Sequence, residues 1–190
     1  FEPTSVQKSA LNRPEKERIA RRAAQLIEDG DTVALDTGTT ALCLAQQLAG
    51  KNHVTVVTSD IRIACLLEEY AGITVVLAGG ALRRGFSCTV GAMTNAALRS
   101  LRVDKAFLAT NAVNADGELC TPDMEQAQVK KALIDMASSV VLICDSSKFG
   151  AESFAKFATL SEVDTLVTDD GLDAETRSKL DSVPVEVIVC

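Results

Sequence analysis

Short runs of β-branched and aliphatic residues alternate with stretches of helical period along most of this chain. The expected strands cover residues 32–35, 54–57, 74–77, 105–109, 140–144, 165–168 and 185–189, and the expected helices cover residues 14–29, 39–48, 60–70, 90–101, 124–136 and 173–180. Such an alternation is typical of parallel strands joined by right-handed helical crossovers. The expected fold is therefore α/β, a doubly wound, mostly parallel sheet with helices on both faces.

A single domain is expected, because the 190-residue sequence shows no internal repeat and no low-complexity tract. Residues 1–11 lack an apolar period and include Pro3, Thr4 and Ser5, so they are expected to form a linker or a tail. The α/β domain is then expected over residues 12–190.

The balance of charges is acidic, with 26 Asp and Glu against 19 Lys and Arg and a formal net charge of −7. This charge repels a polyanion, so the chain is not expected to bind DNA by itself. The basic stretch at 13–22 also contains Glu15 and Glu17, and such a mixed run is typical of a solvated helix face. No apolar run reaches the roughly 18 residues of a membrane span, so we expect a cytoplasmic protein with no membrane partner.

The cysteines do not form a metal-binding pattern. They are Cys43, Cys65, Cys88, Cys120, Cys144 and Cys190, with no Cys-x-x-Cys pair among them. Several lie in apolar stretches, which favours buried, reduced thiols. His53 is the one histidine and lies near no such cluster, so neither a zinc site nor a histidine-based catalytic triad is expected. We expect no metal and no other cofactor.

The loop after the first expected strand is rich in small polar residues. It contains Asp36, Thr37, Gly38, Thr39 and Thr40. In open parallel sheets, ligands bind beyond the carboxyl ends of the strands. A glycine that admits close approach, free N–H groups at a helix start and threonine hydroxyls would together suit a phosphate. An ordinary capped helix start uses the same residue types, so the loop alone leaves both interpretations open.

Loops after three other expected strands should open onto the same crevice. They contain Thr58, Ser59 and Asp60, then Gly79 and Gly80, and then Lys148. Lys148 could supply positive charge for a phosphate, and Asp36 or Asp60 could accept hydrogen bonds from sugar hydroxyls. The alternative for Lys148 is a surface lysine that follows a strand.

A longer loop over residues 116–125 precedes another expected helix. It begins with an Asp-Gly turn signal, and Asp123 is an expected helix cap, which accounts for Asp123 without any ligand. Such a loop is a natural lid, and Lys130 or Lys131 in the helix could reach the crevice.

Several short motifs follow one another in a specific order and spacing. They are Glu-Lys-Glu-Arg-Ile-Ala at 15–20, Leu-Asp-Thr-Gly-Thr-Thr at 35–40, Ala-Gly-Gly at 78–80, Glu125 with Val129-Lys130, Asp-Ser-Ser-Lys-Phe-Gly at 145–150 and Val-Thr-Asp at 167–169. With this set the sequence resembles the effector-binding domain of DeoR-type transcription regulators over residues 15–170.

The resemblance implies a regulatory function. Members of this family carry an amino-terminal winged helix-turn-helix, act mostly as repressors of carbohydrate-use operons and respond to sugar phosphates or related metabolites. The expected partners are therefore a phosphorylated sugar or polyol effector, and DNA only through a helix-turn-helix that this chain does not contain. A homodimer or homotetramer is expected from the resemblance and from the pairing of repressors with palindromic sites.

An enzyme is the main alternative, because the same domain is similar in fold to ribose-5-phosphate isomerase, glucosamine-6-phosphate deaminase and coenzyme A transferases. The isomerase has a phosphate loop and an Asp-x-Ser-Lys element that correspond to 38–40 and 145–148 here. Its acidic catalytic loop would fall at 78–81, which offers no ionisable group for a proton shuttle. Binding without turnover is therefore the expectation, with an isomerase or deaminase, or a module that only assembles subunits, as alternatives.

The sequence departs from the family pattern in two places. Thr-Ser-Asp at 58–60 stands where Thr-Asn-Ser is usual, and Thr-Asn-Ala at 110–112 replaces a glycine-containing turn. The extra carboxylate of Asp60 near a phosphate would be repulsive unless it points to hydroxyls or caps its helix.

Overall fold

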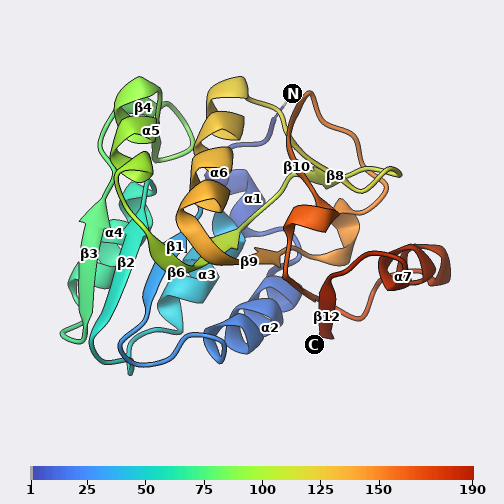
Figure 1. Cartoon of the computed structure of the whole chain (residues 1–190), viewed down its shortest axis with the longest axis horizontal. Coiled ribbons are helices and arrows are strands. Elements are labelled where there is room, and N and C mark those ends of the chain that lie inside the picture. Colours follow the sequence, from blue (N-terminus) through green and yellow to red (C-terminus); the bar gives the residue numbers. More distant parts are fainter. Residues whose placement is uncertain (1) are drawn as a thin grey trace.

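Seven parallel strands form the central sheet of this computed structural model, which describes residues 2–190 (Figure 1). The strands are β1 (Thr32–Leu35), β2 (Val54–Thr58), β3 (Ile73–Leu77), β6 (Val103–Leu108), β9 (Ala137–Ile143), β11 (Thr165–Thr168) and β12 (Glu186–Val189). Their spatial order is β12-β11-β9-β6-β1-β2-β3. The direction of winding reverses between β1 and β6, as in a doubly wound sheet. The expected fold class is confirmed.

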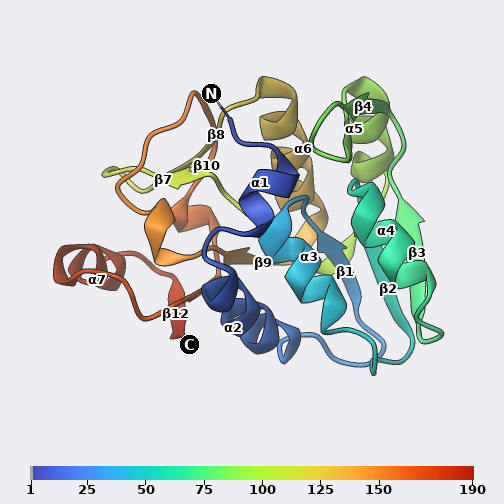
Figure 2. The same cartoon turned by 180° about the vertical axis from the view of Figure 1, so that it is seen from behind.

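Helices cover both faces of the sheet. One face carries α2 (Arg13–Ala24), α3 (Thr39–Gln46) and α4 (Ile61–Glu68), in front in Figure 2, and the other carries α5 (Ala92–Arg99), α6 (Met124–Met136) and α7 (Ala174–Asp181), in front in Figure 1. The observed bounds of α6, β1 and β11 equal the expected ones, and those of α3, α4, α5 and α7 lie within two residues of them, as is usual for helix ends. The helix α2 ends at Ala24, five residues before its expected end.

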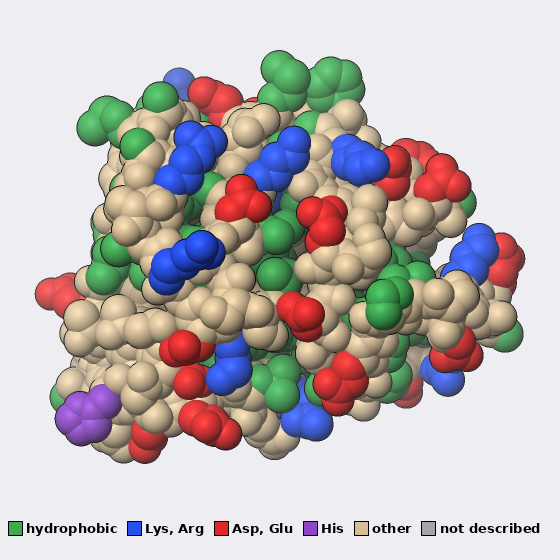
Figure 3. Space-filling view, in the orientation of Figure 1, with side chains coloured by type: hydrophobic (Ala, Val, Ile, Leu, Met, Phe, Trp, Pro, Cys, Tyr) green, Lys and Arg blue, Asp and Glu red, His purple; other side chains and the backbone are tan. Residues whose placement is uncertain are grey.

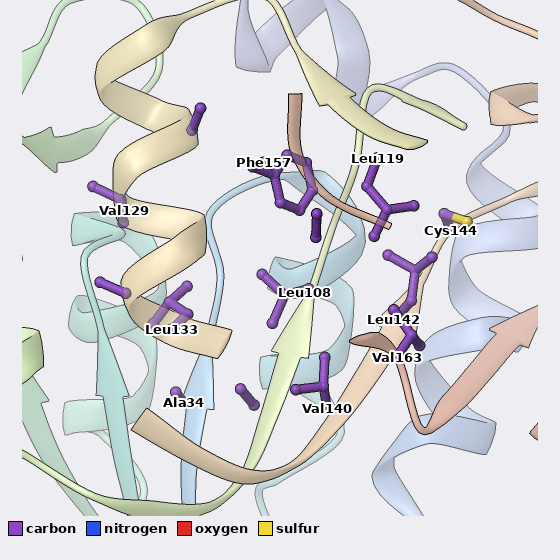
Figure 4. Close-up of a cluster of buried hydrophobic side chains, with 14 of the residues drawn as sticks. Ala34, Leu108, Leu119, Val129, Leu133, Val140, Leu142, Cys144, Phe157 and Val163 are labelled. Carbon is purple, nitrogen blue, oxygen red and sulfur yellow. The ribbon is translucent and has the colours of Figure 1, made fainter. Parts of the chain in front are cut away.

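Two buried apolar clusters hold these layers together, one on each face of the sheet. On the first face, Ile19 of α2 and Leu44 of α3 belong to one cluster. On the second face, Val129 and Leu133 of α6 lie over Leu108 of β6 (Figure 4). Full burial of a side chain of this size stabilises the fold by about 1.5–3 kcal/mol, so these contacts fix the positions of the strand ends.

Several short elements were not predicted from the sequence. They are a helix, α1 (Ser5–Ser9), a hairpin of β4 (Ala81–Arg83) and β5 (Cys88–Val90), an antiparallel sheet of β7 (Ala112–Val113), β8 (Glu118–Thr121) and β10 (Ala155–Thr159), and two 3₁₀ turns, η1 (Ser146–Lys148) and η2 (Leu160–Glu162). Each is too short to show a period of apolar residues, so tertiary contacts decide its conformation.

The segment expected as a linker or tail folds against the domain over its described part. Thr4 caps α1, because its hydroxyl accepts a hydrogen bond from Gln7 N at 3.4 Å while the Gln7 side chain accepts one from Thr4 N at 2.9 Å. Phe1 lies outside the described residues. The helix lies beside α3 (Figure 2), which places residues of this segment close to the carboxyl edge of the sheet.

The cysteines of residues 2–190 are all free thiols. Cys88, Cys120 and Cys144 are buried as expected, whereas Cys65 is exposed. No cluster of His, Cys, Asp or Glu in the described part of the chain could hold a metal ion, and none of its helices is both long and apolar enough to cross a membrane.

Candidate functional site

A cavity opens at the carboxyl edge of the sheet, where β1 and β6 send their loops in opposite directions. Its lining includes Thr37 to Thr40 after β1 and Ala109 to Asn111 after β6. This is the switch point at which doubly wound sheets bind ligands. Five of the residues predicted from sequence line it, namely Thr37, Gly38, Thr39, Thr40 and Lys148.

The start of α3 presents free backbone donors to this cavity. Gly38 is the residue before the helix, with φ of 123°, and within residues 2–190 no side chain caps the first turn. The N–H groups of an uncapped first turn carry the positive end of the helix dipole and are suited to an anion. The structure therefore keeps the phosphate interpretation of this loop open and provides no capping side chain for it.

The floor of the cavity includes Lys130, which forms a buried ion pair with Asp36, whereas Asp36 itself is not among the lining residues. Lys130 Nζ lies 2.5 Å from Asp36 Oδ2, and the two side chains are 3% and 0% exposed. The same carboxylate accepts hydrogen bonds from Thr37 N at 2.8 Å and Ala109 N at 3.0 Å, and Lys130 also donates to Ala109 O at 2.8 Å. Asp36 thus joins the two diverging loops through its own oxygens, and Lys130 reaches the cavity as the sequence suggested.

The cavity lining is strongly cationic although the chain is acidic. It contains Lys8, Lys16, Arg83, Lys130 and Lys148, and Glu2 is the one carboxylate among the described lining residues. Charges of both signs interleave over the exterior face in Figure 3, so the cavity is distinct from that surface. An enclosed group of like charges is stabilised by an anion.

Lys16 shows how crowded these positive charges are. It is 4% exposed and donates to Lys8 O at 2.7 Å. Burial lowers the pKa of Lys16, and the ammonium groups of Lys148 and Lys8 lower it further, while Asp145 opposes them. The Lys148 ammonium group forms no ion pair within residues 2–190. An anion between Lys16 and Lys148 would relieve their mutual repulsion.

Asp60 contacts the loop over residues 37–40 and does not line the cavity. Its Oδ1 accepts from Arg62 N at 2.9 Å and Ile63 N at 3.2 Å, which caps α4. Its Oδ2 accepts from Thr37 Oγ1 at 2.7 Å and Gly38 N at 3.3 Å. Asp60 therefore caps its helix, one of the two roles expected for a carboxylate at this position. Its carboxylate also holds the Thr37-Gly38 turn in place.

The other predicted contacts surround this arrangement without lining the cavity. Thr58 Oγ1 accepts from Asp60 N at 3.1 Å, and Ser59 O accepts from Thr89 N at 2.9 Å. Gly79 O accepts from Thr94 Oγ1 at 3.0 Å, and a Cβ on Gly80 would lie only 2.1 Å from that hydroxyl oxygen. These four residues support the loops and the hairpin around the cavity, and their contact with a ligand stays a prediction.

Several lining residues were missed by the sequence analysis. Glu2 and Lys8 belong to the expected linker, and Arg83 and Gln126 come from the hairpin and from α6. Lys16 carried a usable signal, because it is spaced three residues before Ile19 on the buried stripe of α2. The expectation that the whole basic stretch is solvated was wrong for Lys16.

Comparison with known proteins agrees with the motifs at this edge of the sheet. The model of the DeoR C terminal sensor domain matches residues 11–170. The chain is 36% identical over 187 residues to the HTH-type transcriptional regulator GlpR of Haloferax volcanii, covering 98% of this chain and 73% of that protein. It is 32% identical over 162 residues to the glycerol-3-phosphate regulon repressor of Escherichia coli, covering 85% of this chain and 64% of that protein.

The fold is similar to that of an enzyme as well. Ribose 5-phosphate isomerase A of Methanocaldococcus jannaschii matches with a TM-score of 0.53 and 22% identity, over 73% of this chain and 55% of that one. At this identity the likeness shows a common fold and no common activity. The match to the family model and the likeness of this chain to the two regulators show that it belongs to the DeoR C-terminal sensor domains of transcription regulators and not to an enzyme family.

Proposed function

We propose that the cavity binds a phosphorylated sugar or polyol and reports its presence to the regulator. The observation that carries this proposal is the uncapped first turn of α3, which faces a cavity with five lining cations in a chain of net charge −7. In this arrangement the phosphate binds the backbone N–H groups after Gly38, and Lys148 and Lys16 neutralise its charge.

The hydroxyl groups of the ligand would extend from α3 toward the loop after β6. Thr110, Asn111 and Thr121 line that side of the cavity. The Thr121 hydroxyl donates to Asn111 Oδ1 at 2.9 Å, which leaves the Asn111 amide N–H groups as donors to a sugar oxygen. These polar groups support a polyhydroxylated ligand over a purely apolar one.

Binding without turnover is supported by the ion pairs that the carboxylates at the cavity already form. Asp36 is held by Lys130, and Glu2 is held by Lys8 and Arg83. The described lining contains no histidine, and the loop at 78–81 offers no ionisable side chain. A proton shuttle between adjacent carbons needs a free, positioned base, so the cavity is suited to sensing.

Regulation would follow from a difference in ligand affinity between two arrangements of the regulator. The Escherichia coli relative is named as the repressor of a regulon for glycerol 3-phosphate, a phosphorylated polyol. We propose the same kind of control here, in the cytoplasm, by a homodimer or homotetramer that contacts DNA through an amino-terminal helix-turn-helix.

A thermal-shift panel of sugars and polyols, each with and without phosphate, tests this function. Phosphorylated members are expected to raise Tm in proportion to their binding, and their unphosphorylated counterparts are not. Lys148→Met should weaken binding by about tenfold or more, because a hydrogen bond to a charged group contributes roughly 1.5–3 kcal/mol. Lys131→Met, an exposed change in α6, is the matched control.

Two outcomes would contradict the proposed function. One is a panel in which phosphate makes no difference to Tm. The other is equal binding by Lys148→Met and Lys131→Met. Release of an isomerised product or of ammonia during incubation with the best ligand would favour the enzyme alternative.

A further inference from the structure

Glu2 is the carboxylate-bearing residue among the described lining residues of the cavity. Its Oε1 lies 2.7 Å from Lys8 Nζ, and its Oε2 lies 2.7 Å from Arg83 Nη2. Burial raises the pKa of Glu2, but hydrogen bonds from Arg83 and Lys8 outweigh that effect and hold the pKa below its usual value. An ionised carboxylate of the chain itself therefore lies between two cations that line the cavity.

Arg83 is held in the orientation that receives this carboxylate. Its guanidinium lies over the Phe86 ring, 3.8 Å from the centroid, and Nη1 donates to Gln126 Oε1 at 3.5 Å. Asp123 lies 3.7 Å from Arg83 Nε, but its carboxylate also caps α6 by accepting from Gln126 N at 2.8 Å. Asp123 is thus fixed to α6, whereas Glu2 belongs to the segment that precedes α1.

Gln126 adds a buried donor beside Arg83. Its side chain lines the cavity and is 3% exposed, and its Oε1 accepts from Arg83 and from Cys88 Sγ at 3.5 Å. Its Nε2 donates to no acceptor within residues 2–190. A buried N–H without a partner is destabilising, so this group favours a ligand oxygen beside it. In Figures 1 and 2 the start of the described chain lies beside the amino-terminal end of α6.

We propose that Lys8, Arg83 and Gln126 form a second anion subsite, and that the effector is a phosphorylated sugar acid whose carboxylate displaces Glu2 from it. This proposal rests on the proposed function, because it places the phosphate at the start of α3 and the carboxylate at the opposite end of the same ligand. Glu2 acts as an internal competitor, since its carboxylate and that of the ligand need the same two cations. Binding then releases the segment before α1 from the cavity.

Calorimetric titration with matched ligand pairs tests the subsite. The pairs are ribitol 5-phosphate with ribonate 5-phosphate, and glycerol phosphate with phosphoglycerate, so that each pair differs mainly in the carboxylate. The acid of the better-binding pair is expected to bind at least about tenfold more tightly than its polyol partner, a difference of roughly 1.4 kcal/mol. Glu2→Gln should tighten binding of the acid and change binding of the polyol much less.

Variants of the β4–β5 hairpin test whether Arg83 causes the preference for the acid over the polyol. Arg83→Met should abolish it, and Arg83→Lys should retain part of it. Arg84→Met removes the same charge from the neighbouring exposed position, which does not line the cavity, and should leave the preference intact. Thermal unfolding of each variant shows that it is folded.

Equal binding of both members of each pair would overturn the second subsite and leave the proposed function standing. A preference for the acid that survives Arg83→Met would overturn it too, because the carboxylate would then be recognised elsewhere. Absence of binding by every phosphorylated compound would instead count against the proposed function itself.

Discussion

At the scale of single residues, the Lys130–Asp36 pair determines the shape of the cavity floor. Lys130→Met is expected to lower the free energy of unfolding by about 3–5 kcal/mol, because it leaves the fully buried Asp36 carboxylate without its counter-ion. Urea denaturation measures this loss.

Two further variants separate loss of charge from loss of packing at this pair. The double variant Lys130→Met with Asp36→Asn removes both charges and should recover part of the lost stability. Lys131→Met on the exposed side of α6 should change the unfolding free energy by less than about 0.5 kcal/mol. Equal stability of Lys130→Met and Lys131→Met would show that the pair does not hold the floor.

Single residues also show where sequence reasoning succeeds and where it ends. The strand-to-helix loop with Gly38 could be predicted, because its residue types and its place after a strand are both local signals. The role of Asp60 could not be decided from sequence. Whether its carboxylate contacts a ligand or caps α4 depends on its contact with Thr37, which only the fold brings close to it. Arg83 gave no signal, because only the hairpin and Glu2 place it at the cavity.

At the scale of elements, α6 connects the core to the site. It places Leu133 in the buried cluster and Lys130 at the cavity floor, one turn apart. Leu133→Ala should therefore lower the unfolding free energy by about 2–5 kcal/mol through the cavity that it leaves. Met124→Ala, at a residue of the same helix that is 64% exposed, should cost less than about 0.5 kcal/mol in the same denaturation experiment. Similar losses for both variants would contradict this account of the core.

The η1 turn that carries Lys148 is tied to β11 by the carboxylate of Asp169. Asp169 Oδ1 accepts from Ser146 N at 2.6 Å, and Oδ2 accepts from Ser146 Oγ at 2.8 Å and Gly171 N at 3.0 Å. Burial raises the pKa of Asp169, but these hydrogen bonds lower it more, and the pKa lies below its usual value. The turn is therefore more firmly held when Asp169 is ionised.

A dependence of stability on pH follows from that lowered pKa. A carboxyl group with a lower pKa in the folded state contributes stability above its unfolded pKa of about 3.9, and this contribution is lost as the pH falls through the folded value. Asp169→Asn should thus flatten the fall of the unfolding free energy below about pH 4. Asp181→Asn, at an exposed position of α7, should keep the slope of the unaltered chain, and identical slopes for both variants would count against the prediction.

The helices and strands of the central layers could be predicted, and the short elements added to them could not. Residues 124–136 are long enough to show a helical pattern, and residues 165–168 belong to the regular alternation of apolar strands and helices. The helix α1 and the β4–β5 hairpin lack such a pattern, yet they supply Lys8 and Arg83 to the cavity. Two of the five cationic lining residues were consequently hidden, because their positions depend on contacts between segments far apart in the chain.

At the scale of the whole molecule, the doubly wound sheet brings distant segments to one edge. The reversal between β1 and β6 opens the cavity, helices on both faces fix its floor, and the segment around α1 covers it. A sensor needs a ligand site joined to a part that can move. We propose that the segment before α1 is this part, since Glu2 contacts the Lys8 and Arg83 cations of the cavity lining. The isomerase-like fold is thus compatible with regulation, because binding and catalysis need different residues on the same sheet.

Phosphate binding by the first turn of α3 can be observed at the backbone amides themselves by NMR titration. The ligands are the phosphorylated compound that raises Tm most and its unphosphorylated counterpart, at matched ionic strength. Saturable shifts of the Thr39 and Thr40 amide signals are expected with the phosphorylated ligand, and much smaller shifts with its unphosphorylated counterpart. Saturable binding of the phosphorylated ligand that leaves these two amides unmoved would contradict phosphate binding at this turn.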